Sequence, residues 1–306
     1  MDALEKMLLE QVADLHKLPD GAYNIRSNGG AGGRRSTDHV KIENRTDGKA
    51  GIDLFISPQA KGESVHIPVV ITKEGYGETV YNDFYVGAGA DVLIIAGCGI
   101  HNCGTETAEH SGVHTFHVGK GAKVRYVEKH YGAGDGKGGK IMNPQTVVYL
   151  EEDASLQMET TQIKGIDSTI RTTRGELKAG ANLVVKEKIY THGTQFAKTD
   201  FSVELNGDGA GADVVSRSVA AGSSVQEFNS CIVGRARCHG HTECDALIMD
   251  GAKVTATPCL SAECIDAELI HEAAIGKIAG EQLVKLMTLG LDEKQAEEQI
   301  IKGFLS

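Results

Sequence analysis

Alternating apolar and polar residues run through much of the chain and predict β-strands. Successive side chains of a strand point to opposite faces, so every second residue shares a face. In residues 124–131 one face receives Val124, Tyr126, Glu128 and His130, and the other receives Arg125, Val127, Lys129 and Tyr131. Residues 183–193, LVVKEKIYTHG, alternate in a similar way. The pattern predicts a mainly β protein.

A short phrase, Gly-Ala-x-Val/Leu or a close variant, recurs before these β-rich segments. It begins at Gly62, Gly89, Gly121, Asp153, Gly180, Gly211, Gly222, Gly251 and Asp266. The first five intervals are 27, 32, 32, 27 and 31 residues, and the later ones are 11, 29 and 15. A small corner residue followed by a strand at nearly regular spacing favours a β-solenoid, in which each strand stacks on the previous turn. The irregular later intervals leave a β-sandwich or jelly roll open.

Helical patterns occupy both ends of the chain. Within residues 1–18, apolar side chains recur at the spacing of an amphipathic helix, at Leu4, Met7, Leu8, Val12, Leu15 and Leu18. Near the C-terminus, a helix over roughly 279–289 is expected to stop at Gly290, and Asp292 is expected to cap a second helix that Gly303 ends. We therefore expect a helical segment and linker at 1–39, a β core at 40–269 and a helical segment at 270–306.

The second C-terminal helix carries apolar side chains on one face, at Ala296, Ile300 and Ile301, and is followed by Phe304 and Leu305. An exposed Phe304–Leu305 tail is compatible with a docking surface for another protein. Simple packing of the hairpin on the end of the β core is the alternative.

Charge and cysteine content narrow the functional classes. A formal net charge of -11 repels phosphate backbones, so we expect no nucleic-acid partner. No apolar run approaches the roughly 20 residues that span a bilayer, and residues 1–18 lack the apolar region of a signal peptide. We therefore expect a cytoplasmic protein without a membrane partner. An odd number of cysteines, 7, then indicates free thiols and argues against a disulfide framework.

The densest group of metal-binding residue types is RCHGHTEC, residues 237–244. Its spacing lacks the C-x2-C pairs of a zinc knuckle. On a strand, His239 and His241 share one face while Cys238 and Cys244 lie on the other. This segment cannot close a four-ligand site alone, so further ligands have to come from neighbouring strands or from another chain.

A second group lies in residues 97–123 and contains Cys98, His101, Cys103, His110, His114 and His117. These residues flank a glycine-rich segment, so either a metal site or a polar loop followed by a strand is possible. His-x-His also suggests a cupin, but HGHTE lacks the wider gap that a cupin places before its glutamate. Phosphate-loop, zincin and nucleophile-elbow motifs are absent, and GAGDGKGGK at 132–140 is expected to be a flexible loop.

Residues 270–306, IHEAAIGKIAGEQLVKLMTLGLDEKQAEEQIIKGFLS, strongly resemble the C-terminal end of the SufB/SufD family, the core scaffold proteins of the SUF iron–sulfur cluster assembly system. The preceding HTECDALIMDGAKVTATPCL resembles the family's cysteine-bearing strand, and the resemblance extends over about 40–306. It implies a right-handed parallel β-helix with helical ends that dimerises through the β-helix. It also implies a SufC-type ABC ATPase that docks on the C-terminal helices, and apo iron–sulfur proteins as recipients.

The resemblance also assigns roles to individual residues. Cys244 matches a cysteine on which cluster assembly depends in SufB, Glu272 matches the acidic residue of its His-Glu pair, and His271 matches a histidine important in SufD. We therefore expect these three residues, contributed by two protomers, to bind iron and sulfur of a transient iron–sulfur cluster. Auxiliary candidates are Cys98, Cys103, Cys238, His239 and His241. The chain departs from longer SufB proteins because no cysteine lies between Cys103 and Cys231, where they carry a sulfur-accepting cysteine.

This resemblance predicts an assembly scaffold and not an enzyme, working as a homodimer or with a SufB/SufD homologue, while ATP is hydrolysed by the partner. Two alternatives stay open. One is a SufD-like structural subunit without its own cluster. The other is a metal-binding cupin-like enzyme or a sugar-processing β-helix protein, against which an aromatic content of 5% and the absence of tryptophan count.

Overall fold

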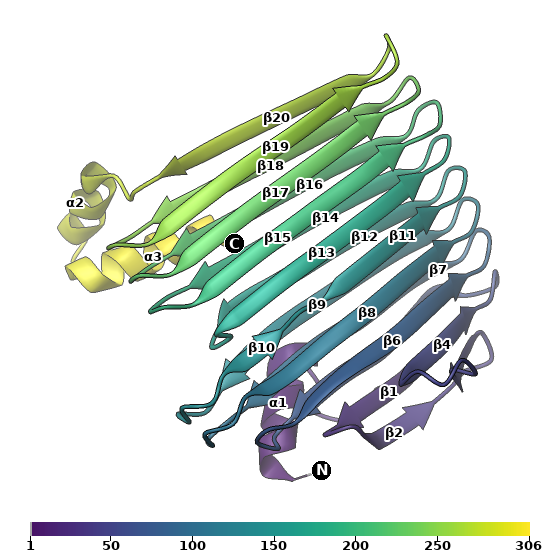
Figure 1. Ribbon diagram of the computed structural model, residues 1–306, viewed down its shortest axis with the longest axis horizontal. Coiled ribbons are helices and arrows are strands. Elements are labelled where there is room, and N and C mark those ends of the chain that lie inside the picture. Colours follow the sequence, from purple (N-terminus) through teal and green to yellow (C-terminus); the bar gives the residue numbers. More distant parts are fainter. Residues whose placement is uncertain (1) are drawn as a thin grey trace.

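The computed structural model describes residues 2–306, with the side chain at position 164 excepted. Two ten-stranded sheets face each other along the length of the molecule (Figure 1). Sheet A contains, in spatial order, β2 (Gly30–Arg35), β1 (Ala22–Ser27), β5 (Lys61–Ile71), β7 (Asp91–His101), β9 (Lys123–Ala133), β12 (Ser155–Lys164), β14 (Asn182–Thr191), β16 (Gly211–Ala220), β18 (His239–Ile248) and β20 (Glu268–Gly276).

Sheet B contains, in spatial order, β19 (Lys253–Ala262), β17 (Val225–Gly234), β15 (Phe196–Leu205), β13 (Ser168–Leu177), β10 (Lys140–Met142), β8 (Ala108–Val118), β6 (Gly77–Val86), β4 (Gly51–Ile56) and β3 (Val40–Asn44). A further strand, β11 (Gln145–Leu150), continues the β10 rung between β8 and β13.

The chain alternates between the two sheets, and each circuit adds one turn to a parallel β-solenoid of about eight turns. Among the strands within residues 2–306, only the pairs β1·β2 and β3·β4, at the N-terminal end, are antiparallel. This confirms the predicted solenoid. The parallel pairing excludes the sandwich and jelly-roll alternatives, and no double-stranded barrel of the cupin type occurs within residues 2–306, so that the cupin-like reading is wrong.

The interior is lined by every second residue of the strands. On β9 the buried residues are Val124, Tyr126, Glu128 and His130, as the alternation predicted. Aliphatic and aromatic side chains from both sheets form one continuous core that runs from Ala22 to Cys244. The parallel register places inward-facing residues of one turn beside inward-facing residues of the next. The apolar faces of successive strands therefore line the same interior.

Two interleaved series of turns explain the irregular intervals of the repeated phrase. Left-handed backbone conformations precede or begin sheet A strands at Gly62, Gly89, Gly121, Asp153, Gly180 and Gly209. A second series precedes sheet B strands at Gly165, Gly193, Gly222 and Asp250, at intervals of 28, 29 and 28 residues. Phrases that begin at Gly222 and Gly251 belong to this second series. The short intervals of 11 and 15 residues each run from a turn of one series to a turn of the other.

The N-terminal helix α1 (Ala3–Ala13) covers part of the outer face of sheet A. Asp2 caps it and forms a capping box with Glu5. Leu8 and Leu9 are buried against Ile25 and Val70. The predicted amphipathic helix is confirmed, although it ends at Ala13 and not near residue 18.

Glycines in β7 make room for this helix. A Cβ atom at Gly97 would lie 2.2 Å from the carbonyl oxygen of Val12, and one at Gly99 would lie 3.2 Å from Leu8. A side chain at position 97 would therefore displace α1, whereas one at position 99 would require Leu8 to shift by a few tenths of an ångström.

The C-terminal hairpin consists of α2 (Gly280–Thr288) and α3 (Glu293–Phe304), as the sequence predicted. Gly290 adopts a positive φ of 95° and Asp292 caps α3. One expectation is wrong: Leu305 is 7% exposed, so the tail is packed and not an exposed docking element. The apolar side chains that are exposed lie on and after α2, at Val284, Met287 and Leu289.

The solenoid is longer at both ends than the expected range of 40–269. Strand β1 joins sheet A through β5 within the segment expected to be a helix and linker. Strand β20 continues sheet A to Gly276, within the segment expected to be helical. His271 and Glu272 therefore lie on a strand of the solenoid and not at the start of a helix.

Candidate functional site

The three residues predicted to bind the cluster lie on the last two strands of sheet A. Strand β18 pairs with β20 in parallel, and the register places Thr242 opposite His271, Glu243 opposite Glu272 and Cys244 opposite Ala273. Cys244 points into the solenoid. His271 shares that inner face as a diagonal neighbour, whereas Glu272 points outward because adjacent residues of a strand face opposite ways. Within one chain, the sheet separates Glu272 from the other two residues.

Cys244 is 1% exposed and belongs to the apolar core. Burial, followed by the charges of Glu187 and Asp245, raises the pKa of its thiol to about 12. The thiol is therefore protonated at neutral pH. A metal ion could bind this sulfur only after the proton is lost, because a thiolate and not a thiol is the ligand.

His271 lies at this end of the interior. Its Nδ1 shares a hydrogen bond of 2.6 Å with Thr242 Oγ1, and Thr242 is fully buried. The hydrogen bond fixes the ring of His271 and leaves its other nitrogen available. Since β20 is the terminal strand of sheet A, the ring is next to the open end of the core.

A group of three potential metal ligands lies on the opposite, outer face of the same strands. His241, Glu243 and Glu272 each offer one ligand atom, and these atoms lie within 4.8 Å of one another. Asp213 Oδ1 accepts a hydrogen bond of 2.8 Å from His241 Nδ1, so that Nε2 is directed to the site, 3.9 Å from Glu272 Oε2. An imidazole oriented by a carboxylate is the usual arrangement of a metal-binding histidine. Imidazole and carboxylate together suit a divalent ion such as Fe²⁺.

Glu243 was missed by the sequence reasoning, although it could have been found. In His241-Thr242-Glu243, the first and third residues share a face of a strand. Burial, followed by the hydrogen bond to Asp245, raises the pKa of Glu243 above its ordinary value. A bound cation would favour its ionised form.

The remaining cysteine and histidine residues of RCHGHTEC do not join either group. Cys238 is 6% exposed and faces the interior, and burial raises its pKa. His239 is exposed, with Nδ1 4.0 Å from Glu268 Oε2. The prediction that the segment cannot close a metal site by itself fits these positions.

The second group, residues 97–123, is divided among several environments. Cys98, His110 and His114 are buried, whereas Cys103 is exposed in a loop near His101. His117 points outward from sheet B. The polar loop followed by a strand is the alternative that fits, and residues 134–139 of the glycine-rich segment also form a loop between β9 and β10.

The buried members of this group adjoin an ionic cluster inside the solenoid. Arg171 Nη1 donates a hydrogen bond of 2.6 Å to Glu128 Oε2, and Arg171 also approaches Glu187 at 3.5 Å. Burial opposes ionisation of Glu128, but the charges of Arg171 and His130 hold its pKa well below its ordinary value. A row of polar residues on the inner face of sheet A then links this cluster to the candidate site, in the register Glu128, Thr160, Glu187, Ser216 and Cys244.

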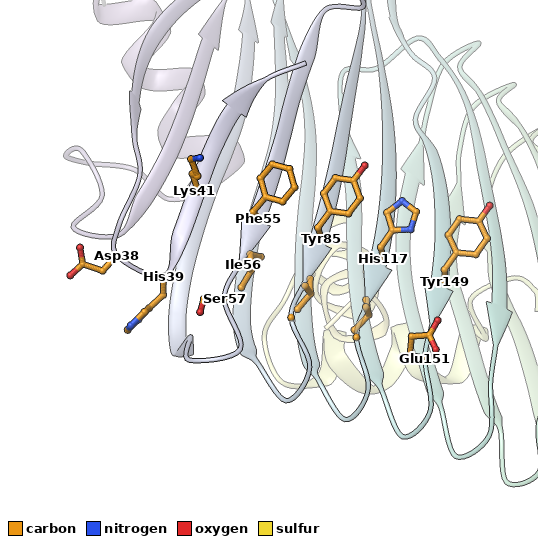
Figure 2. Close-up of a pocket in the computed structure, with 14 residues that line it drawn as sticks. Asp38, His39, Lys41, Phe55, Ile56, Ser57, Tyr85, His117, Tyr149 and Glu151 are labelled. Carbon is orange, nitrogen blue, oxygen red and sulfur yellow. The ribbon is translucent and has the colours of Figure 1, made fainter. Parts of the chain in front are cut away.

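A sugar-processing protein would need exposed aromatic rings in a pocket, and a wide pocket on the outer face of sheet B does contain aromatic rings (Figure 2). Its floor is a ladder of stacked rings contributed by β4, β6, β8 and β11. The centroid separations are 5.0 Å for Phe55–Tyr85, 4.9 Å for Tyr85–His117 and 5.3 Å for His117–Tyr149. The ring planes are within 14° of parallel, so the rings stack on one another and Tyr85 and His117 have no free face for a sugar. The ladder stabilises the stacking of turns.

Fold and site together define a class: a parallel β-solenoid with a buried thiol, an imidazole and a surface imidazole–carboxylate group at its C-terminal end. The sequence profile described as "SUF system FeS cluster assembly, SufBD core domain" matches residues 82–304. The chain belongs to the SufB/SufD family. Its helices within residues 2–306 are too short or too polar to cross a membrane.

Curated relatives carry the same family name. An iron–sulfur cluster assembly SufBD family protein homolog of Methanothermobacter thermautotrophicus is 31% identical over 245 residues, covering 77% of this chain and 57% of its own length. Another from Methanocaldococcus jannaschii is 26% identical over 262 residues, covering 85% of this chain and 82% of its own. The chain thus spans little more than half the length of the first relative.

Proposed function

We propose that this protein is a scaffold on which an iron–sulfur cluster is built before transfer to apo-proteins. The observation that carries the proposal is the β18–β20 register, which places the Cys244 thiol and the His271 imidazole on one inner face at the end of the solenoid. Thiolate sulfur is a strong ligand for iron, and imidazole is a weaker one. A nascent cluster held by such a mixed set is easier to release than one held by four cysteines.

Glu272 takes a different part in this proposal from the one expected. With His241 and Glu243 it forms an iron site on the outer face of β18 and β20. Oxygen and nitrogen ligands hold Fe²⁺ before it meets sulfur, whereas Cys244 holds the cluster. Iron and sulfide are substrates here, and the protein orders them at one end of the fold.

The part of one chain that the structure describes does not supply a complete ligand set around Cys244, so the proposal includes a second chain. Strands β19 and β20 are the terminal strands of their sheets. Exposed edges pair readily with another chain, and Ile270 and Ile275 add exposed apolar side chains to this end. A second copy or a SufB/SufD homologue that pairs here would bring further ligands to Cys244 and His271. Separation of the two chains would open the site.

The partner that drives such an opening is proposed to be a SufC-type ABC ATPase on the C-terminal helices. Exposed apolar residues on and after α2, namely Val284, Met287 and Leu289, fit a protein surface better than water. Substitution of Val284 by Glu should abolish co-purification with the ATPase. The control Leu18→Glu, an exposed leucine at the other end, should leave it unchanged. Equal co-purification of both variants would contradict the assignment.

Anaerobic reconstitution with Fe²⁺ and sulfide tests the scaffold role. Wild type should retain iron and acid-labile sulfide after gel filtration, and Cys244→Ala should lose both. Cys264→Ala is the matched control, because Cys264 is a half-buried thiol outside the site. Equal iron and sulfide in wild type and Cys244→Ala would overturn the proposal.

The burial of Cys244 also supports a second candidate, a SufD-like subunit that binds the ATPase but carries no cluster. A thiol that is 1% exposed in the core is well suited to a purely structural role. In that case wild type purified without oxygen contains neither iron nor sulfide, alone or after reconstitution.

A further inference from the structure

Two cysteines on the outer face of sheet B lie directly opposite each other. The parallel register pairs Cys231 of β17 with Cys259 of β19. Their sulfur atoms are 2.8 Å apart, which is closer than two nonbonded sulfur atoms normally approach. Paired residues of neighbouring strands are separated by about 4.7–4.9 Å. This falls within the Cα separation of roughly 4.4–6.8 Å that a disulfide spans.

The two thiols differ in accessibility. Cys259 is exposed on the terminal strand of sheet B, whereas Cys231 is half-buried one strand further in. Burial and the neighbouring Cys259 sulfur raise the pKa of the Cys231 thiol to about 11. A reagent in solution therefore meets Cys259 first, and Cys231 is positioned to react second.

A groove beside the pair gives a small molecule room to reach it. Thr172, Arg174, Asp200, Asn229 and Thr257 line this groove together with both cysteines. The Asn229 amide donates a hydrogen bond of 2.7 Å to Asp200, which fixes one wall. The guanidinium of Arg174 also lines this groove and adds a positive charge that attracts anionic reagents.

We propose that Cys231 and Cys259 are a site of reversible thiol modification that takes low-molecular-weight disulfides and closes to a Cys231–Cys259 disulfide. The Cys259 thiolate attacks one sulfur of the reagent, forms a mixed disulfide and expels one thiolate. The Cys231 thiolate then attacks Cys259 Sγ, forms the protein disulfide and expels the second thiolate. The reagent disulfide gains two electrons and the two cysteines lose them, while their two protons pass to the expelled thiolates.

The modification joins the terminal strand of sheet B to its neighbour. Cys231 and Cys259 are 28 residues apart, so the bond closes one complete turn of the solenoid. It therefore restrains fraying of the last turn, which has a strand on one side only.

Peptide mapping of the full chain after equilibration in glutathione redox buffers tests the site. Trypsin releases Cys231 within residues 218–235 and Cys259 within residues 254–277, which also contain Cys264. The experiment therefore uses the Cys264→Ser variant alongside wild type. As the ratio of oxidised glutathione rises, a disulfide-linked pair of these peptides should appear. The thiol titre of the unfolded chain, 7 when reduced, should fall by two.

The controls separate the proposal from simple surface oxidation. Cys231→Ser should trap glutathione on Cys259 as a stable mixed disulfide, and Cys103→Ser should leave the linked peptides unchanged. The Cys244→Ala variant should form the link like wild type, so failure of the scaffold role does not affect the result. Persistent mixed disulfide at Cys259 in wild type, or no reaction at either thiol, would overturn the proposal.

Discussion

Arg171 and Glu128 form an ion pair of 2.6 Å inside the solenoid and thereby join sheet B to sheet A. Their side chains are 7% and 5% exposed, and Glu187 approaches the same guanidinium. Burial lowers the pKa of Arg171, but the charges of Glu128 and Glu187 outweigh it and raise the pKa above its ordinary value. Glu128 of this pair begins the row of inward-facing polar residues on sheet A that ends at Cys244.

Loss of one partner of this pair should be strongly destabilising. Arg171→Met removes the guanidinium that two buried carboxylates share, and we expect it to lower the free energy of unfolding by about 3–5 kcal/mol. The double variant Glu128→Gln/Arg171→Met should cost less than the sum of the single changes. Urea titrations measure both. Lys178→Met, which breaks the exposed Lys178–Glu151 pair, is the control and should change stability by less than about 1 kcal/mol.

Stability should also fall on mild acidification because of His114. Burial lowers the pKa of its imidazole to about 4 in the folded state, whereas the unfolded value is about 6.5. The unfolded chain therefore binds more protons in this window, so the contribution is fully present above about pH 6.5 and is lost toward pH 4. It amounts to roughly 1.4 kcal/mol per pH unit, or about 3 kcal/mol in total.

Urea titrations of wild type and His114→Gln between pH 7.5 and 5 check this effect. Glutamine can keep hydrogen bonds to Tyr126 and Asn82, which His114 contacts at 2.8 and 3.2 Å. The variant should lose less stability than wild type over the same pH range. If both proteins lose the same stability between pH 7.5 and 5, a group other than His114 causes the loss.

Cys244 should resist alkylation in the isolated folded protein. A thiol that is 1% exposed with a pKa of about 12 presents little thiolate to iodoacetamide at pH 8. The exposed thiol of Cys103 should be labelled within the same time. Mass spectrometry of timed samples gives both rates, and equal labelling would mean that the end of the solenoid opens readily. Full labelling of both thiols in urea is the control.

The surface group should bind Fe²⁺ through His241, Glu243 and Glu272. We expect Glu272→Gln to weaken Fe²⁺ binding at least tenfold, and Asp213→Asn to weaken it about 10–100-fold through loss of the hydrogen bond that orients His241. Anaerobic calorimetry measures the affinity. Glu268→Gln removes a carboxylate from the same face of the same strand and should have no such effect. Equal affinity of wild type and Glu272→Gln would remove Glu272 from the site.

Much of the architecture could be predicted because it depends on local patterns. The alternation in residues 124–131 correctly separated inward from outward side chains, and Asp292 and Gly290 correctly marked the helix boundaries. The start of the solenoid before residue 40 was harder to predict. Strand β1 contains few alternating residues, and its place in sheet A depends on pairing with β5.

The sequence by itself determined the period of each element, since the side-chain direction along a strand and the ends of a helix depend on neighbouring residues. It therefore determined that Cys238 and Cys244 face away from His239 and His241. Only the tertiary structure decided which strands are adjacent and in which register, because this depends on turn lengths and on packing between residues about 30 positions apart. That register joins Glu272 to His241 and Glu243, and it brings Cys231 against Cys259.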